Sequence, residues 1–201
     1  MGRILVAVAG DSISAGSPLW DPDPGVRRAI AAPDERSCWQ FWAARADPRL
    51  DFRTSAVYGQ RTDDIAARVD GVAAGADVLV VQGGINDVAQ RRPVEEAARN
   101  LADAVERGRA LGCAVVLADV LPWDNGDERA DAEILRLNEL VRALADGLGV
   151  ALLPFHDTLA DPGRPGRMRP GLTDDGDHPS VAGHRLLGER AFRLPEPAGG
   201  G

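Results

Sequence analysis

A serine, a histidine and several carboxylates occur in the sequence where they could together carry out acyl transfer. Ser12 lies in the stretch VAVAGDSISAG, residues 6–16, directly after an apolar run. His178 lies in LTDDGDHPS, residues 172–180, and Asp175 precedes it by three positions. A serine hydroxyl is a weak nucleophile unless a base accepts its proton, and a third group has to orient that base. These residue types therefore suggest a nucleophile, its base and an orienting acid.

Two glycine-containing turns and an asparagine could complete such a site. The segment YGQRT, residues 58–62, follows the second apolar run, and GGIND, residues 83–87, follows the third. Backbone N–H groups at tight turns and side-chain amides can stabilise the oxyanion of a tetrahedral intermediate. Each motif alone is more typical of a turn or a helix cap. Their joint occurrence, in order along the chain, is what points to catalysis.

The three histidines of the chain have different surroundings. His184 falls within the last helical pattern and His156 lies just after the fifth apolar run, so structural or solvated roles are expected for both. His178 precedes Pro179 at the junction of a loop and a helix. It is the histidine expected to act as the base.

Apolar strand patterns alternate with amphipathic helical patterns along the whole chain. The predicted strands are Ile4–Ala9, Leu50–Val57, Val78–Gln82, Ala114–Val120 and Val150–Phe155. The predicted helices are a short one near Val26–Ala31, then Cys38–Ala46 capped by Ser37, Asp63–Val72, Pro93–Leu111, Ala130–Leu148 and about Ser180–Ala191. Such alternation predicts a parallel sheet with helices on both faces. Because ligands bind at the carboxyl ends of such strands, the motifs above should meet at one edge.

Composition narrows the class of protein. The 201 residues favour a single domain, residues 1–194, followed by a tail at 195–201 that we expect to be disordered. The net charge of −8 argues against nucleic-acid binding. No apolar run approaches the roughly 18 residues of a membrane span, and the amino terminus lacks a signal-peptide pattern, so a cytoplasmic location is expected.

Cysteine and lysine usage exclude further chemistries. Cys38 and Cys113 have neither metal-site nor disulfide spacing and are expected to be reduced and buried. All 23 basic residues are arginine, which excludes Schiff-base chemistry and a Ser-Lys dyad.

At the positions singled out above, the sequence resembles the SGNH hydrolases, the GDSL-type esterases and lipases. Gly10-Asp11-Ser12 is similar to the first block of that family, with Ile13 in place of the usual leucine. Gly59 is similar to the glycine of the second block. Gly84 and Asn86 fit the GxND block, and Asp175 and His178 fit the DxxH block. The resemblance extends from residue 4 to about residue 192. The G-x-S-x-G motif of α/β-hydrolases does not occur at Ser12.

The resemblance implies an α/β fold, a flavodoxin-like three-layer α/β/α sandwich around a five-stranded parallel sheet. It also implies a carboxylic ester hydrolase that acts through an acyl-enzyme without metal or cofactor. Ser12 would be the nucleophile and His178 the base, acting through Nε2. Asp175 would orient the base, although the spacing also allows Asp174. The oxyanion donors would be the backbone N–H groups of Ser12 and Gly59 and the amide of Asn86.

The substrate is less well defined by the sequence. Asp11 and Trp123 are candidates for substrate contact, and Asp11 is also expected to hold its turn. Trp20 is a further candidate, whereas Arg164, Arg167 and Arg169 are more typical of a solvated loop than of an anion site. The predicted loops contain few large aliphatic residues, which favours a small polar ester with a short acyl group, such as a carbohydrate ester. An acyltransferase or thioesterase with the same triad, and a non-catalytic flavodoxin-like binding module, remain alternatives.

Overall fold

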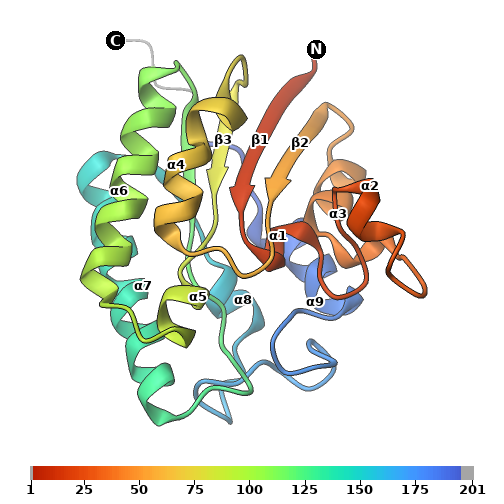
Figure 1. Cartoon of the computed structure of the whole chain (residues 1–201), viewed down its shortest axis with the longest axis vertical. Helices are drawn as coiled ribbons and strands as arrows, with labels where there is room; N and C mark the ends of the chain where they lie inside the picture. The colour runs from red at the N-terminus through yellow and green to blue at the C-terminus, as the bar shows by residue number, and fades with distance from the viewer. Residues whose placement is uncertain (1, 196–201) are drawn as a thin grey trace.

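The computed structural model describes residues 2–195, in which five parallel strands form one sheet (Figure 1). The strands run in the order β2-β1-β3-β4-β5. Their bounds are β1 Ile4–Gly10, β2 Leu50–Ala56, β3 Val78–Val81, β4 Ala114–Ala118 and β5 Ala151–Leu153. The predicted α/β class and the five-stranded parallel sheet are therefore confirmed. The strand order reverses after β1, so the crevice beside the carboxyl end of β1 is where such a sheet binds ligands.

The sheet separates two apolar layers because successive side chains of a strand point to opposite faces. Val6 and Val8 of β1 belong to one buried cluster, and Ala7 and Ala9 belong to the other. All four side chains are fully buried, as expected for a strand covered on both faces.

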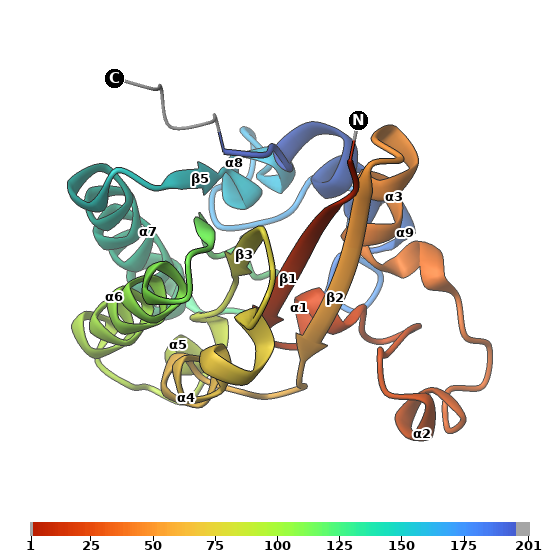
Figure 2. The ribbon, with the colours of Figure 1, turned by 90° about the horizontal axis from the view of Figure 1, so that it is seen from above.

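Helices cover both faces of the sheet (Figure 2). One face carries the helices α4 Thr62–Ala73, α6 Val94–Ala110 and α7 Glu128–Leu148, whose buried side chains share a cluster. The other face carries α3 Trp39–Ala46, α8 Phe155–Leu159, α9 Val181–Leu186 and the π-helical segment η2 Leu187–Ala191. Trp39 lies at the centre of the second layer, with its ring centroid 5.5 Å from that of Phe52 and 5.7 Å from that of Phe155. The arrangement is a three-layer α/β/α sandwich.

Three short helices were not predicted, and each begins at or just beyond a strand end. They are α1 Ser12–Ala15, α5 Ile85–Ala89 and α8. Four or five residues are too few to show a helical period in the sequence. The predicted fifth strand, Val150–Phe155, was too long because no pattern in the sequence indicated the short helix α8. In the structure β5 ends at Leu153 and α8 begins at Phe155.

Two helix predictions need correction. Ser37 does not cap α3. It ends the 3₁₀ turn η1 Glu35–Ser37, and its hydroxyl donates to the carbonyls of Gly16 and Asp34, both at 2.8 Å. The last predicted helix divides into α9 and η2, whereas the predicted short helix near Val26 is α2 Pro24–Arg27.

The described part of the chain bears on two further expectations. No helix within residues 2–195 is both long and apolar enough to cross a membrane. The predicted disordered tail lies outside the described residues, apart from Pro195.

Candidate active site

Ser12, His178 and Asp175 meet at the carboxyl edge of the sheet. Ser12 is the first residue of α1, directly beyond β1, and the other two belong to the loop before α9. The Oγ atom of Ser12 lies 3.1 Å from Nε2 of His178. The Nδ1 atom of His178 lies 2.8 Å from Oδ2 of Asp175. These contacts form one continuous hydrogen-bonded chain from a hydroxyl through an imidazole to a carboxylate.

Asp175, rather than the neighbouring Asp174, contacts the imidazole. Oδ1 of Asp175 also accepts the backbone N–H groups of Asp177 at 2.9 Å and of His178 at 2.8 Å. Burial opposes ionisation of this carboxyl, but the hydrogen bonds from His178 and from both N–H groups prevail and hold its pKa below the usual value. Asp174 is exposed, and no hydrogen bond joins it to His178 in the described structure.

Asp11 holds the turn that presents Ser12. Its Oδ1 caps α1 by accepting the N–H of Ile13 at 3.0 Å. The side chain is completely buried, and its Oδ2 has no hydrogen-bond partner within the described residues. Burial raises the pKa of Asp11 to about 6, against the opposing effect of hydrogen bonds from Ile13 and Gln82. The predicted substrate contact of Asp11 is therefore corrected, because its side chain is fully covered by protein atoms and lines no pocket beside Ser12.

Helix α1 is anchored behind Ser12 by a buried network. The hydroxyl of Ser14 donates to Oε1 of Gln82 at 2.8 Å and accepts Nε1–H of Trp39 at 3.2 Å. Gly10 is needed for this approach, because a Cβ there would lie 2.8 Å from Cβ of Ser14 and 2.9 Å from Oε1 of Gln82. Each residue of the first motif thus has its own structural role. Gly10 leaves room for Ser14 and Gln82, Asp11 caps α1, and Ser12 is the first residue of that helix.

The oxyanion candidates surround the same edge. Asn86 lies in α5, and its Nδ2 donates to the carbonyl of Gln60 at 2.9 Å. Gly59, one residue earlier, has φ of +75°, a backbone conformation that favours glycine. A Cβ at Gly59 would meet no protein atom within 4 Å, so conformation rather than crowding explains this glycine. As the first residue of a helix, Ser12 has an N–H outside the helical hydrogen-bond pattern.

A small pocket of about 190 Å³ opens in front of Ser12. Its lining is mostly apolar or polar without charge, and consists of Ser12, Ile13, Tyr58, Ile85, Asn86, Ala89, Trp123, Asp177 and His178. Trp123 is thus placed where the sequence suggested a substrate contact. Gly59 does not line this pocket, but its loop is held against Asn86 through Gln60.

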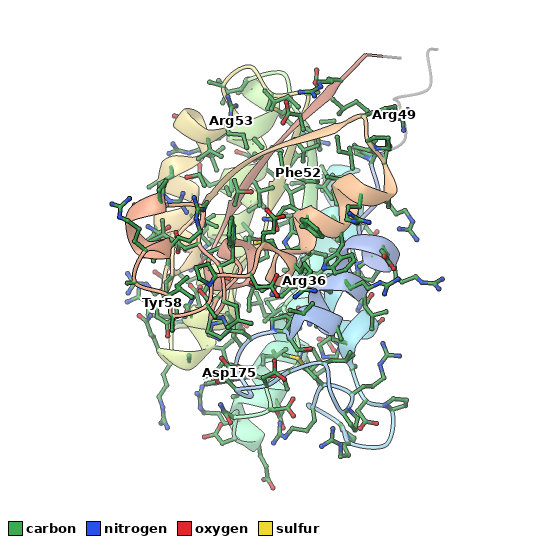
Figure 3. All side chains as sticks on the ribbon, turned by 90° about the vertical axis from the view of Figure 1, so that its right-hand side faces the viewer. Arg36, Arg49, Phe52, Arg53, Tyr58 and Asp175 are labelled. Carbon is green, nitrogen blue, oxygen red and sulfur yellow. The ribbon has the colours of Figure 1, made fainter. Side chains whose placement is uncertain are left out.

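Tyr58 and Asp177 are two pocket residues that the sequence analysis did not select. Tyr58 is 68% exposed, and its ring centroid lies 6.0 Å from that of His178. Tyr58 and Asp175, both labelled in Figure 3, line a common hollow beside this pocket. Asp177 accepts Nε1–H of Trp123 at 2.6 Å and Nδ2–H of Asn125 at 2.8 Å, so its carboxylate is engaged by the loop after β4. The available signal for Tyr58 was its position after a strand and its being the one tyrosine in the chain.

The other histidines and the arginine loop lie apart from this pocket. His184 is fully buried, and burial lowers its pKa to about 3. His156 contacts Oδ1 of Asp157 through Nδ1 at 3.2 Å. Arg167 forms an ion pair with Asp131 at 2.9 Å, and Arg164 forms one with Asp161 at 2.7 Å. Arg164 thus closes the loop on itself and Arg167 attaches it to α7, and neither lines the pocket. Trp20 lines an adjoining hollow instead.

Metal-ligating side chains do not gather elsewhere in the described structure. Among residues 2–195, no group of three or more His, Cys, Asp or Glu side chains is arranged to hold a metal ion. Cys38 and Cys113 are both buried free thiols, as expected.

A Ser-His-Asp chain at the carboxyl edge of a parallel sheet is the arrangement with which serine hydrolases perform acyl transfer. The protein belongs to the GDSL-like lipase/acylhydrolase family, whose model matches residues 8–186. Members of this family are carboxylic ester hydrolases. The resemblance to the SGNH hydrolases is thereby confirmed.

Solved structures show the same fold. A lipolytic protein of the G-D-S-L family from Desulfitobacterium hafniense DCB-2 has a TM-score of 0.76 at 19% identity, covering 93% of this chain and 97% of that one. A lipolytic G-D-S-L family protein from Veillonella parvula DSM 2008 has a TM-score of 0.74 at 19% identity, covering 92% and 94%. TesA has a TM-score of 0.66 at 26% identity, covering 93% and 95%. No curated protein matches the chain.

Proposed function

We propose that the protein hydrolyses esters of short acyl groups with small polar alcohols through an acyl-enzyme on Ser12. The observation that carries this proposal is the unbroken chain of contacts from Ser12 Oγ through His178 to Asp175. A binding module would have no use for both a base and the acid that orients it.

In the first half-reaction, Ser12 Oγ bonds to the ester carbonyl carbon while its proton passes to His178 Nε2. The tetrahedral intermediate collapses as the bond to the alcohol oxygen breaks, and that oxygen takes the proton from Nε2. Water then attacks the acyl-enzyme, giving a proton to Nε2, and the acid departs as Ser12 regains its proton. Asp175 accepts the hydrogen bond from Nδ1–H throughout and remains ionised, which fixes the tautomer and stabilises the imidazolium.

Asn86, Ser12 and Gly59 would stabilise the oxyanion. The Asn86 amide has two N–H donors, and one of them binds the Gln60 carbonyl. The second remains for the substrate, and the bond to Gln60 holds the amide in place. The backbone N–H groups of Ser12 and Gly59 would supply the other donors.

The pocket in front of Ser12 supports the preference for a short acyl group. Its volume of about 190 Å³ matches a small group. Ile13, Ile85, Ala89 and Trp123 supply its apolar lining. Each additional CH₂ gains roughly 0.8 kcal/mol only while there is apolar surface to cover it. Chains that outgrow the pocket should gain nothing further.

The test is kcat/KM on p-nitrophenyl esters from C2 to C12, with Ser12→Ala as the blank and Ser55→Ala as the matched control. We expect a maximum at C2 to C4, no activity in Ser12→Ala and retained activity in Ser55→Ala. An organophosphonate should add one adduct, on Ser12. A maximum at C8 or longer would contradict the short-acyl proposal, and hydrolysis of no ester would contradict the proposed function. Repeating the panel with thioesters, and with sugar or alcohol acceptors, separates hydrolysis from thioesterase and acyltransferase activity.

A further inference from the structure

A second hollow, of about 370 Å³, adjoins the pocket in front of Ser12. Tyr58, Asp177 and His178 line both spaces, whereas Ser12 and Asn86 line only the smaller one. The other wall of the hollow comes from the segment between α1 and α3, and consists of Ser17, Pro18, Trp20, Asp21, Val26 and Ile30. His178 therefore lies at the boundary between the two spaces.

The position of His178 assigns one part of an ester to each space. The alcohol oxygen has to receive its proton from His178 Nε2, while the carbonyl carbon bonds to Ser12. With the acyl group in the pocket in front of Ser12, the alcohol portion extends past His178 into the larger hollow.

Three carboxylates line the hollow, and the guanidinium of Arg27 lies beside it, against the Trp20 ring. Asp21, Asp175 and Asp177 line it, and no arginine lines either space. Asp21 is only 7% exposed and forms no ion pair in the described structure, although Oδ1 accepts the N–H of Asp23 at 2.7 Å. The hydrogen bonds that Asp177 accepts come from uncharged donors, namely Trp123 and Asn125. Neither Asp21 nor Asp177 therefore forms an ion pair among the described residues.

Aromatic rings accompany these carboxylates. Trp20 and Tyr58 both line the hollow. The Arg27 guanidinium lies 4.2 Å from the centroid of the Trp20 ring, the geometry of a cation–π contact. Arg27 donates to the main-chain carbonyl of Asp21 at 2.7 Å, and not to its carboxylate. A hollow lined by aromatic rings and by carboxylates without ion-pair partners favours cations over anions.

We propose that this hollow binds the alcohol portion of the ester and selects alcohols that carry an ammonium group over neutral and anionic ones. The assignment rests on the proposed ester hydrolysis for its orientation. The charge preference rests independently on the lining of the hollow.

The test compares acetate esters that differ in charge but little in shape. Acetylcholine and 3,3-dimethylbutyl acetate differ only in a quaternary nitrogen against a carbon, and 2-acetoxyethanesulfonate supplies the anion. We expect kcat/KM to be about five- to tenfold higher for acetylcholine than for its neutral isostere, and lower for the anion than for either. Added salt at about 0.5 M should reduce both differences. A ratio of one or less for the first pair would overturn the proposal.

Variants of single carboxylates identify the source of the preference. Asp21→Asn keeps an oxygen for the Asp23 N–H and should lower the ratio of kcat/KM for acetylcholine to that for the neutral isostere. Asp177→Asn, in a different loop, should lower it as well and guards against misfolding of the first variant. Asp23→Asn is the matched control, because it removes a charge from the same segment but does not line the hollow. A ratio unchanged in both Asp21→Asn and Asp177→Asn would overturn the proposal.

A binding measurement separates this proposal from the proposed function. Calorimetry on Ser12→Ala should show choline binding more tightly than 3,3-dimethylbutan-1-ol, with the difference reduced by an added Asp21→Asn. This result would support the charged hollow even if no ester were hydrolysed. Equal binding of the two alcohols, or none, would overturn the cation preference even if esters were hydrolysed.

Discussion

Asp175 holds His178 with both of its carboxylate oxygens. Oδ2 contacts ring Nδ1 at 2.8 Å, and Oδ1 accepts the backbone N–H of the same residue at 2.8 Å. A side chain bonded to both the ring and the main chain of one histidine fixes the ring and the loop together. The loop is held from outside as well, because Asn125 Nδ2 donates to the Asp175 carbonyl at 2.9 Å.

Asp175→Asn should therefore abolish most of the activity while leaving the fold intact. An amide that donates toward Nδ1 favours the wrong tautomer, and a comparable change in serine proteases lowers kcat about 10⁴-fold. We expect kcat on p-nitrophenyl acetate to fall by roughly 10³- to 10⁴-fold. Asp174→Asn is the matched control, and full activity is expected. An inactive Asp174→Asn beside an active Asp175→Asn would show that the orienting acid was wrongly assigned.

Asn86→Ala should lower kcat with little change in KM, because an oxyanion donor acts in the transition state and not on the bound ester. The loss of one such donor typically costs about 100- to 1,000-fold in kcat. Gln90→Ala is the control. Gln90 Nε2 donates to the Gly59 carbonyl at 3.5 Å, but its side chain does not line the pocket, so a much smaller loss of kcat is expected. Steady-state kinetics on both variants make the comparison. A rise in KM at unchanged kcat in Asn86→Ala would argue for a role in ground-state binding only.

Gly10→Ala should impair catalysis through the position of α1. The new Cβ would lie 2.8 Å from Cβ of Ser14 and 2.9 Å from Gln82 Oε1, so the helix that carries Ser12 has to shift. A displacement of about 1 Å at a reacting group costs on the order of 100-fold in rate. Gly147→Ala is the control, because nothing lies within 4 Å of a Cβ there. Wild-type kcat in Gly10→Ala would show that the network behind Ser12 tolerates the change.

Asp119→Asn should alter the pH dependence of stability. Asp119 is buried just beyond β4, and burial raises its pKa to about 6, although the His156 N–H bound to Oδ1 opposes this. Between 3.8 and about 6 the folded protein binds more protons at this site than the unfolded chain, so the site favours folding at low pH. That contribution is lost as the pH rises through the folded pKa and amounts to about 3 kcal/mol.

The measurement for Asp119→Asn is urea unfolding from pH 4 to pH 8. The free energy of unfolding of the variant, relative to wild type, should increase as the pH rises through this range. Asp174→Asn serves as the control for removal of one exposed carboxylate. A constant difference for Asp119→Asn would show that Asp119 is ionised to the same extent in the folded and unfolded states.

Much of the fold follows from patterns that are local in sequence. The apolar run of β1 needs cover on both faces, and its alternation with amphipathic helices allows only a parallel sheet with two helical layers. That sheet brings all strand ends to one edge. The sequence alone therefore predicts that the motifs at Ser12, Asn86 and His178 lie near one another.

The sequence by itself determined the sheet, its layers and the edge at which the candidate site lies, because strand and helix periods are properties of short segments. Only the tertiary structure decided which neighbouring acid holds His178, because Asp174 and Asp175 are both close enough to it in sequence. The loop around Gly176 packs against Asn125, and this packing directs the carboxylate of Asp175 to the imidazole. It also buried Asp11 behind Ser12 and brought Trp20 and Asp21 beside Tyr58 to form the second hollow. These outcomes depend on packing between segments far apart in the chain, which no local pattern encodes.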